Sequence, residues 1–214
     1  NQKNCTSVVT IQDTVRPVAV CQNITVYLDG SGSAAITGTD VDGGSTDNCG
    51  ISTRTASPTL FTCADIGSNN VTMTVTDANM NSSTCAAMVT VRDTTRPVAA
   101  CQNIKVYLDG AGNASITAAD VDGGSTDNCG APMLVASPTS FTCANLGSNP
   151  VTLTMTDASG NTSSCLAMVT VQDTTRPVLV CQDVTIYIDN MVLAPFNVFI
   201  VGMLVSQSDN CGVQ

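Results

Sequence analysis

The sequence predicts an all-β protein made of tandem immunoglobulin-like β-sandwich modules of about 80 residues, stapled by disulfides. Two observations carry this prediction. The stretch 40–50 (DVDGGSTDNCG) recurs letter for letter as 120–130. Four cysteines also keep one register, so that Cys21, Cys49, Cys63 and Cys85 return as Cys101, Cys129, Cys143 and Cys165. A strict period of this size indicates an array of small folded units.

Short alternating segments predict the strands of each module. In 24–28, 71–75 and 87–91, apolar residues alternate with polar ones in β-branched-rich sequence, which is typical of half-buried strands. Turn sequences such as 157–161 (DASGN) separate them. About seven such strands per module predict an immunoglobulin-like sandwich. We expect 71–91 to form the hairpin of its last two strands.

The period divides the chain into two complete modules and two partial ones. The first segment matches the end of a module and predicts a strand that completes a neighbouring module. The last matches only the beginning of a module, to be completed by another chain or by downstream sequence. Its apolar run 191–205 is short for a bilayer span, so we expect a buried strand pair there. The four segments are 1–15, 16–95, 96–175 and 176–214.

The cysteine content indicates an oxidising, extracellular compartment. Eleven cysteines at periodic spacing occur with no histidine and no C-x-x-C pair, which favours disulfides over zinc thiolates. Only 3% of the residues are aromatic and none is Trp, so the cores are thin. Cross-links worth about 2–4 kcal/mol each therefore matter for stability.

Charge and composition exclude several function classes. A net charge of −10 with 7 basic residues disfavours nucleic acid and anionic membrane surfaces as partners. Without histidine there is no imidazole base, and cysteines held in bridges cannot act as nucleophiles. We therefore expect no enzyme activity, no catalytic residues and no membrane insertion.

Four motifs recur along the chain: D-N-C-G at 47–50, F-T-C at 61–63, T-D-A at 76–78, and D-T-T-R-P at 93–97. Together they resemble hyalin repeat (HYR-like) domains, in particular the four-cysteine form strung in tandem in large secreted surface proteins of Bacteroidota. The resemblance covers residues 1–190, while 190–208 departs from the pattern. It implies an immunoglobulin-like fold used in adhesion, extracellular matrix or filaments, with no catalysis.

Chain reach limits the disulfide pairing. A bond between Cys85 and Cys101 would join residues about 50 Å apart along an extended chain, whereas bridged Cα atoms lie within about 7 Å. In immunoglobulin-like sandwiches the first and last strands can run parallel, side by side, so their first residues meet. We therefore predict the pairs Cys21–Cys85 and Cys101–Cys165.

The remaining cysteines of the two modules are expected to clip the middle strands as Cys49–Cys63 and Cys129–Cys143. An exchange of partners stays open, because sequence alone does not determine connectivity.

Three cysteines are left over: Cys5, Cys181 and Cys211. Cys5 is a last-strand cysteine without its module, and Cys181 is a first-strand cysteine without its closing strand. One hypothesis is strand donation, in which copies of the chain assemble head to tail and Cys181 bonds Cys5 of the next subunit. The alternative is an excerpt of a longer repeat protein, in which Cys5 pairs upstream and Cys211 downstream.

Acidic loops suggest calcium as the one conceivable cofactor. Carboxylates in a glycine-bent loop are hard oxygen ligands, and aspartates at the module junctions, Asp93 and Asp173, could add to them. The alternative is that the Asp-Gly loops are turns that cap strands. The candidate ligands are Asp40, Asp42 and Asp47 with their copies Asp120, Asp122 and Asp127.

Junction threonines are a second candidate site. Thr14, Thr94 and Thr174 each follow an Asp, which is similar to the D-T acceptor that Bacteroidota use for O-glycosylation. The alternative is a polar linker that keeps the chain extended.

Taken together, the sequence favours a structural subunit of an extracellular filament or surface fibre. The second hypothesis is the stalk of a tandem-repeat adhesin.

Overall fold

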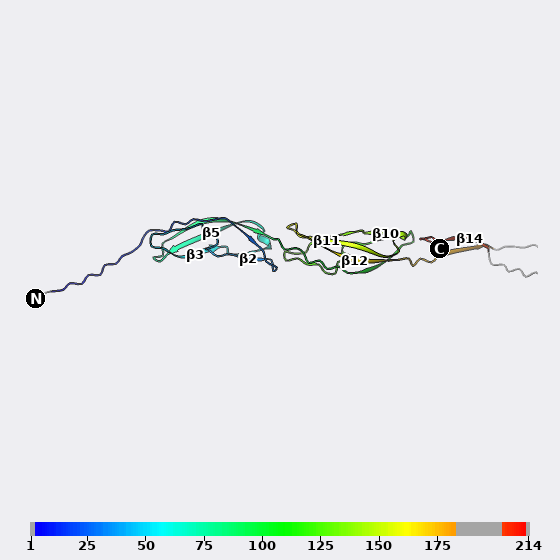
Figure 1. Ribbon diagram of the computed structural model, residues 1–214, viewed down its shortest axis with the longest axis horizontal. Coiled ribbons are helices and arrows are strands. Elements are labelled where there is room, and N and C mark those ends of the chain that lie inside the picture. Colours follow the sequence, from blue (N-terminus) through cyan, green and yellow to red (C-terminus); the bar gives the residue numbers. More distant parts are fainter. Residues whose placement is uncertain (1–2, 183–202, 213–214) are drawn as a thin grey trace, which may run out of the picture. The chain divides into compact units, whose positions relative to one another are not determined.

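The computed structural model describes residues 3–182 and 203–212 (Figure 1). The regular structure of these residues consists of strands and three single-turn 3₁₀ helices, as the all-β prediction requires. None of the described helices has the length and apolar character needed to cross a membrane. The chain divides into two compact units. The first comprises Asn1–Val98, Thr126–Met133 and Thr156–Thr162, and the second comprises Ala99–Ser125, Leu134–Met155 and Ser163–Gln214.

The first repeat folds into two sheets. A four-stranded sheet has the order β1-β6-β5-β3, and a two-stranded sheet pairs β2 with β4. The strands are β1 (Ile24–Tyr27), β2 (Ser33–Ala35), β3 (Ile51–Ser57), β4 (Leu60–Thr62), β5 (Gly67–Asp77) and β6 (Ser82–Arg92), and the 3₁₀ turn η1 is Cys63–Asp65.

The second repeat has the same architecture, with the orders β7-β12-β11-β9 and β10-β8. Its strands are β7 (Ile104–Tyr107), β8 (Asn113–Ser115), β9 (Met133–Ser137), β10 (Ser140–Thr142), β11 (Gly147–Thr156) and β12 (Thr162–Gln172), with 3₁₀ turns η2 (Ala119–Val121) and η3 (Cys143–Asn145). Beyond it, β13 (Val178–Gln182) pairs antiparallel with β14 (Met203–Ser208). Most of the apolar run 191–205 lies outside the described residues.

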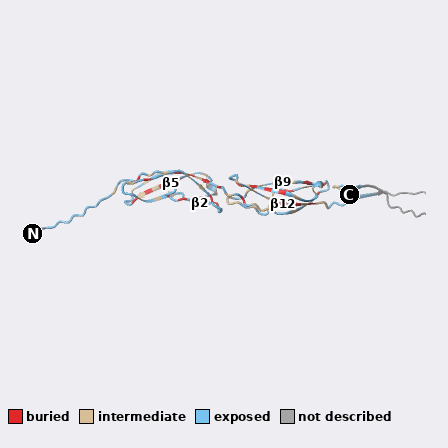
Figure 2. Ribbon diagram, viewed as in Figure 1, coloured by how far each residue is buried: buried red, intermediate tan, exposed pale blue. Residues whose placement is uncertain are grey.

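The buried residues recur at the period of the sequence. In each repeat the alternating apolar positions of the long hairpin, such as Val71, Met73 and Val75 in β5, are fully buried (Figure 2). A single phenylalanine in each repeat, Phe61 or Phe141, packs into the same cluster. The aliphatic and phenylalanine side chains thus form one small core per repeat, as the alternation predicted.

The first and last strands of each repeat run parallel. β1 pairs with β6 so that Ile24 lies opposite Val89, and β7 pairs with β12 in the same way. The cysteines just before these registers meet: Cys21 bonds Cys85 and Cys101 bonds Cys165, with Cα–Cα distances of 5.8 and 5.9 Å. These are the pairs expected from the strand arrangement.

The other expected pairs are wrong. Cys63 bonds Cys129 of the following repeat, not Cys49, and Cys143 bonds Cys211, not Cys129. The physical reason lies in the sheets. Cys49 precedes β3 and Cys63 follows β4, but β3 and β4 belong to different sheets and do not pair. The chain therefore does not return Cys63 to Cys49, which is free and exposed, as is Cys5.

Candidate functional site

The D-N-C-G loop forms the same backbone turn in both repeats. In the second repeat it follows an isolated bridge between Val98 and Thr126. The carboxylate of Asp127 then accepts the backbone N–H of Cys129 at 2.9 Å, which closes an Asx turn. The other carboxylate oxygen of Asp127 is buried and accepts no hydrogen bond. The cysteine at its end carries the disulfide to Cys63.

Three aspartates converge at this loop. Asp93 follows β6, Asp127 lies in the loop, and Asp157 follows β11; one oxygen of each lies within 4.8 Å of the others. Asp93 and Asp157 are only 6% and 8% exposed. The backbone oxygen of Asp93 also accepts the side-chain amide of Asn161 at 3.3 Å. Three ionised carboxylates that are shielded from solvent repel one another, and a bound cation would offset this repulsion.

Three oxygens at this loop lack a hydrogen-bond partner. One oxygen each of Asp93, Asp127 and Asn128 is buried and accepts no hydrogen bond. Buried acceptors without donors are rare and call for an explanation such as a bound ion. In the first compact unit these oxygens therefore form a candidate cation site.

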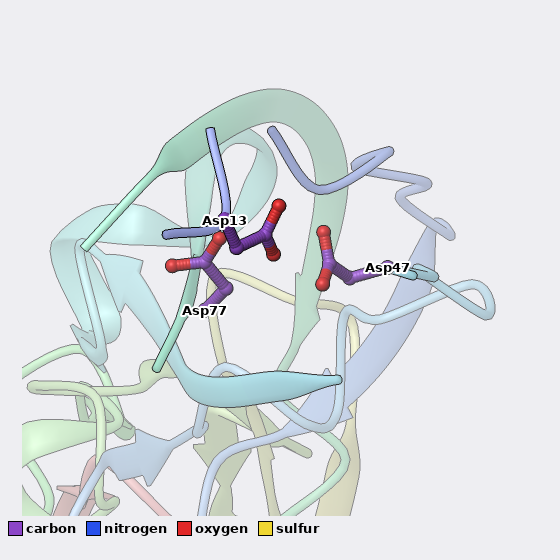
Figure 3. A group of neighbouring side chains, drawn as sticks. All are labelled: Asp13, Asp47 and Asp77. Carbon is purple, nitrogen blue, oxygen red and sulfur yellow. The ribbon is translucent and has the colours of Figure 1, made fainter. Parts of the chain in front are cut away.

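The same arrangement occurs at the start of the first repeat. Asp13, Asp47 and Asp77 also bring one oxygen each within 4.8 Å of one another, and Figure 3 shows the Asp47 side chain facing the other two carboxylates. One oxygen of Asp13 and one of Asp47 are buried without a partner. The backbone oxygen of Asp13 accepts the amide of Asn81 at 3.1 Å, which repeats the Asn161–Asp93 contact.

A third copy of the loop is partly described in the second unit. The side-chain amide of Asn210 donates to the carboxylate of Asp173 at 3.2 Å, just as Asn128 donates to Asp93. One oxygen each of Asp209 and Asn210 is again buried without a partner. The loop therefore recurs with an unsatisfied oxygen on its aspartate each time, and the asparagine adds a second in the copies at Asn128 and Asn210.

The donor set fits a hard divalent cation. Each complete group offers three carboxylates, and carboxylate and amide oxygens are the ligands that Ca²⁺ prefers. Among the described residues, the only ion pair joins Arg54 to Asp42, so no basic side chain neutralises these groups. Calcium bound there would supply the missing positive charge.

The calcium ligands expected from the sequence divide into two groups. Asp47 and Asp127 lie in the clusters. Asp40 and Asp120 instead accept the backbone N–H of Thr37 and Thr117, each at 2.6 Å, and cap turns.

Asp42 and Asp122 are also turn residues. Asp42 accepts the Ser45 hydroxyl at 2.6 Å and pairs with Arg54, and Asp122 accepts the Ser125 hydroxyl. The Ser45 hydroxyl, together with backbone donors and Arg54, lowers the pKa of Asp42 to about 2. These four aspartates are therefore turn residues, and at least one carboxylate oxygen of each accepts turn hydrogen bonds. The aspartates that complete the clusters are the D of D-T at the junctions and the D of T-D-A after the long strand. Of these two positions, only the junction one was singled out from the sequence.

The remaining expected site residues lie on the surface or outside the described side chains. Thr14, Thr94 and Thr174 are exposed. The Asp13 carboxylate raises the pKa of the Cys49 thiol by accepting its hydrogen bond, helped by burial and by the charges of nearby aspartates. The side chain of Cys181 lies outside the description.

No family model matches the chain, and no curated protein matches it. Among solved structures, protocadherin gamma B7 extracellular cadherin domains 1-4 align over 81% of this chain and 55% of that one, with 11% identity and a TM-score of 0.36. Human protocadherin-24 EC1-2 aligns over 75% and 100%, with 13% identity and a TM-score of 0.39. Protocadherin gamma B2 domains 1-5 align over 80% and 43%, with 11% identity and a TM-score of 0.35. The chain thus spans about half the length of the gamma B7 and gamma B2 fragments.

Proposed function

We propose that this chain is a structural element of an extracellular fibre, in which β-sandwich repeats are joined in series by disulfides and stiffened by calcium. The observation that carries the proposal is the pairing of Cys63 with Cys129 and of Cys143 with Cys211. Each bond links the F-T-C cysteine of one repeat to the D-N-C-G cysteine of the next. Such a chain of covalent links transmits tension along the repeats, and the bonds persist in an oxidising, extracellular environment.

Assembly of subunits head to tail extends the same principle. Cys5 occupies the sequence position of Cys85, and Cys181 occupies that of Cys21. The last-strand segment 1–15 of one copy would complete the partial module 176–214 of another by strand donation, locked by a Cys5–Cys181 disulfide. Residues 3–15 form no strand within the described chain, which leaves their backbone available for pairing.

Acidity and exposed threonines suit this role. The net charge of −10 keeps neighbouring fibres apart. The exposed Thr14, Thr94 and Thr174 would carry glycans on the outside of the fibre without disturbing the cores.

Electron microscopy of native material, with mass analysis before and after reduction, tests the proposal. We expect filaments, and a ladder that collapses on reduction to subunits of about 21.9 kDa. Short, non-fibrous particles in both calcium and chelator would overturn the fibre. A single very large reduced chain would replace the subunit version by the stalk of a tandem-repeat adhesin.

A further inference from the structure

One interface is built twice within the chain. In the first unit the loop that carries Cys129 lies against the turn 29–32: the side-chain amide of Asn128 donates to the backbone oxygen of Asp29 at 3.1 Å. In the second unit the amide of Asn210 donates to the backbone oxygen of Asp109 at 3.0 Å. In both, a disulfide to the F-T-C cysteine lies beside this hydrogen bond. The interface therefore consists of a D-N-C-G loop on one side and a D-G-x-G turn with an F-T-C cysteine on the other.

A glycine shapes the receiving side. Gly32 has φ of +74°, and a Cβ there would lie 2.6 Å from the sulfur of Cys63 and 2.8 Å from the backbone oxygen of Asn128. Gly112 repeats this with φ of +77° and distances of 2.7 Å to Cys143 and 2.9 Å to Asn210. Any side chain would therefore push the arriving loop away. The turn is adapted in both repeats to hold this loop.

The first D-N-C-G loop has the same internal structure, but within residues 3–182 and 203–212 no D-G-x-G turn lies against it. Asp47 accepts the N–H of Cys49 at 2.8 Å, so its Asx turn is already formed. Asn48 and Cys49 are exposed, whereas Asn128 and Cys129 are partly buried. The amide of Asn48 reaches only the Asp13 carboxylate and the Cys49 sulfur, both at 3.4 Å. The loop is thus preformed, and Asn48 and Cys49 remain exposed.

We propose that the loop 46–50 is a docking site for the F-T-C end of another repeat module of this kind. Asn48 donates to the backbone oxygen of that module's D-G-x-G turn, and Cys49 forms a disulfide with its F-T-C cysteine. Cys63 and Cys143 are already bonded, so the occupant is a repeat whose F-T-C cysteine is free. The inference rests on the proposed serial linkage of repeats and names the partner of this face.

The covalent step is an oxidation. Two thiols lose two protons and two electrons as the S–S bond forms, and a disulfide oxidant of the extracellular or secretory compartment accepts them and becomes a dithiol. Docking through the Asn48 hydrogen bond would raise the local concentration of the two thiols and so select this pair.

The first test adds one repeat in register. Asn1 aligns with Asn81, so a copy of residues 16–80 placed before Asn1 restores a complete module ahead of Cys5. After alkylation of free thiols, peptide mass spectrometry should find the added F-T-C cysteine bonded to Cys49, and the added first-strand cysteine bonded to Cys5. A free Cys49 thiol beside an intact bond to Cys5 would overturn the proposal, because the added module has then folded without docking.

The second test uses two full-length variants in a glutathione redox buffer, so it does not depend on the added module. The donor carries C5S, C49S, C181S, N210A and C211S, which leaves Cys143 as its free thiol and weakens the tail that covers it. The acceptor carries C5S and C181S and keeps Cys49; the matched control acceptor carries C49S and C181S and keeps Cys5.

We expect the Cys143–Cys49 dimer to form at least tenfold faster than the Cys143–Cys5 dimer, and N48A in the acceptor to slow it about fivefold, the effect of one hydrogen bond. Equal rates for the two acceptors would overturn the proposal. Fibres seen by microscopy together with equal rates would reject the docking site alone, whereas selective cross-linking without fibres would reject the proposed function alone.

Discussion

Two loops of identical sequence, 46–50 and 126–130, have different surroundings. Both close the same Asx turn and aim one unpartnered aspartate oxygen at two other carboxylates. Only the second has its cysteine bonded and its asparagine held against another turn. Because the sequences are the same, the difference comes from the partner. The loop is therefore a preformed connector whose geometry does not depend on being connected.

The repeats also differ at a few positions where the backbone is the same. Met80 stands where the second repeat has Gly160, and Arg54 stands where it has Leu134. Each pair is an internal control, because the equivalent position in the other repeat shows the same backbone with the alternative residue.

Breaking the connector is expected to have the largest effect. The Cys63–Cys129 bond closes a loop over a sequence separation of 66 residues. In the chain-entropy model a bond of this span contributes about 4 kcal/mol. The double variant C63S/C129S should therefore lose about 4 kcal/mol in the free energy of unfolding, measured by guanidinium titration under non-reducing conditions.

The unconnected loop supplies the control. C49S replaces an exposed thiol that forms no disulfide with a hydroxyl that can still donate a hydrogen bond, so we expect a change within about 0.5 kcal/mol. If C49S destabilises the chain as much as the double variant does, the loop 46–50 depends on the Cys49 side chain itself. The comparison between a connected and an unconnected loop is then invalid.

Removing calcium is expected to have the next largest effect. Ligand binding to the native state stabilises it by RT ln(1 + [L]/Kd). For a Kd of about 0.1 mM, at the tight end of extracellular sites, 1 mM calcium adds about 1.4 kcal/mol, which chelation should abolish. The site of Asp93, Asp127 and Asp157 should bind more tightly than that of Asp13, Asp47 and Asp77, because Asn128 adds a buried oxygen.

Calorimetry of the full chain and of two matched variants separates the sites. D127N should remove the tighter binding event and D47N the weaker one. Absence of heat when calcium is added to the chelator-treated chain, with the same unfolding curve in both conditions, would reject cation binding at both loops.

The turn after β5 gives a smaller effect of opposite sign in the two repeats. Met80 has φ of +69° and is 82% exposed, whereas Gly160 has φ of +87°. A left-handed conformation is unfavourable for a residue with a Cβ, although glycine loses more entropy on folding. M80G should therefore stabilise the chain by about 0.5–1 kcal/mol, and G160M should destabilise it by a similar amount. Thermal unfolding measures both, and a loss of stability in M80G would show that the Met80 side chain makes a contact worth more than the strain.

Much of the fold was predictable from the sequence because its signals are local. Alternation predicted the hairpin 71–91, which the structure shows as β5 and β6 over 67–92, and the parallel first and last strands accounted for Cys21–Cys85. The expected Cys49–Cys63 pair was wrong. The spacing of the repeats shows which cysteines are equivalent, but it does not show whether the partner of a cysteine lies in the same repeat or in the next one. Likewise, Asp47 was singled out as a candidate calcium ligand from its own loop, whereas Asp77 and Asp157 join the clusters through the ends of β5 and β11, which the sequence does not place.

The smallest expected effect concerns the ion pair that only the first repeat has. The pKa of Asp42 is about 2, below the unfolded value of about 3.9. A depressed native pKa stabilises the fold above pH 4, and this stabilisation is lost as pH falls through about 2. R54L should cost about 0.5 kcal/mol at pH 7, since Arg54 is 30% exposed. At pH 2, where Asp42 is about half protonated, the cost should fall to about half of that value or less. Denaturant titrations at both pH values measure the difference between the parent chain and R54L.

Introducing the pair into the second repeat with L134R, opposite Asp122, should produce the reverse change. An R54L cost that is the same at pH 2 and pH 7 would show that Arg54 acts through packing of its aliphatic stem and not through its charge.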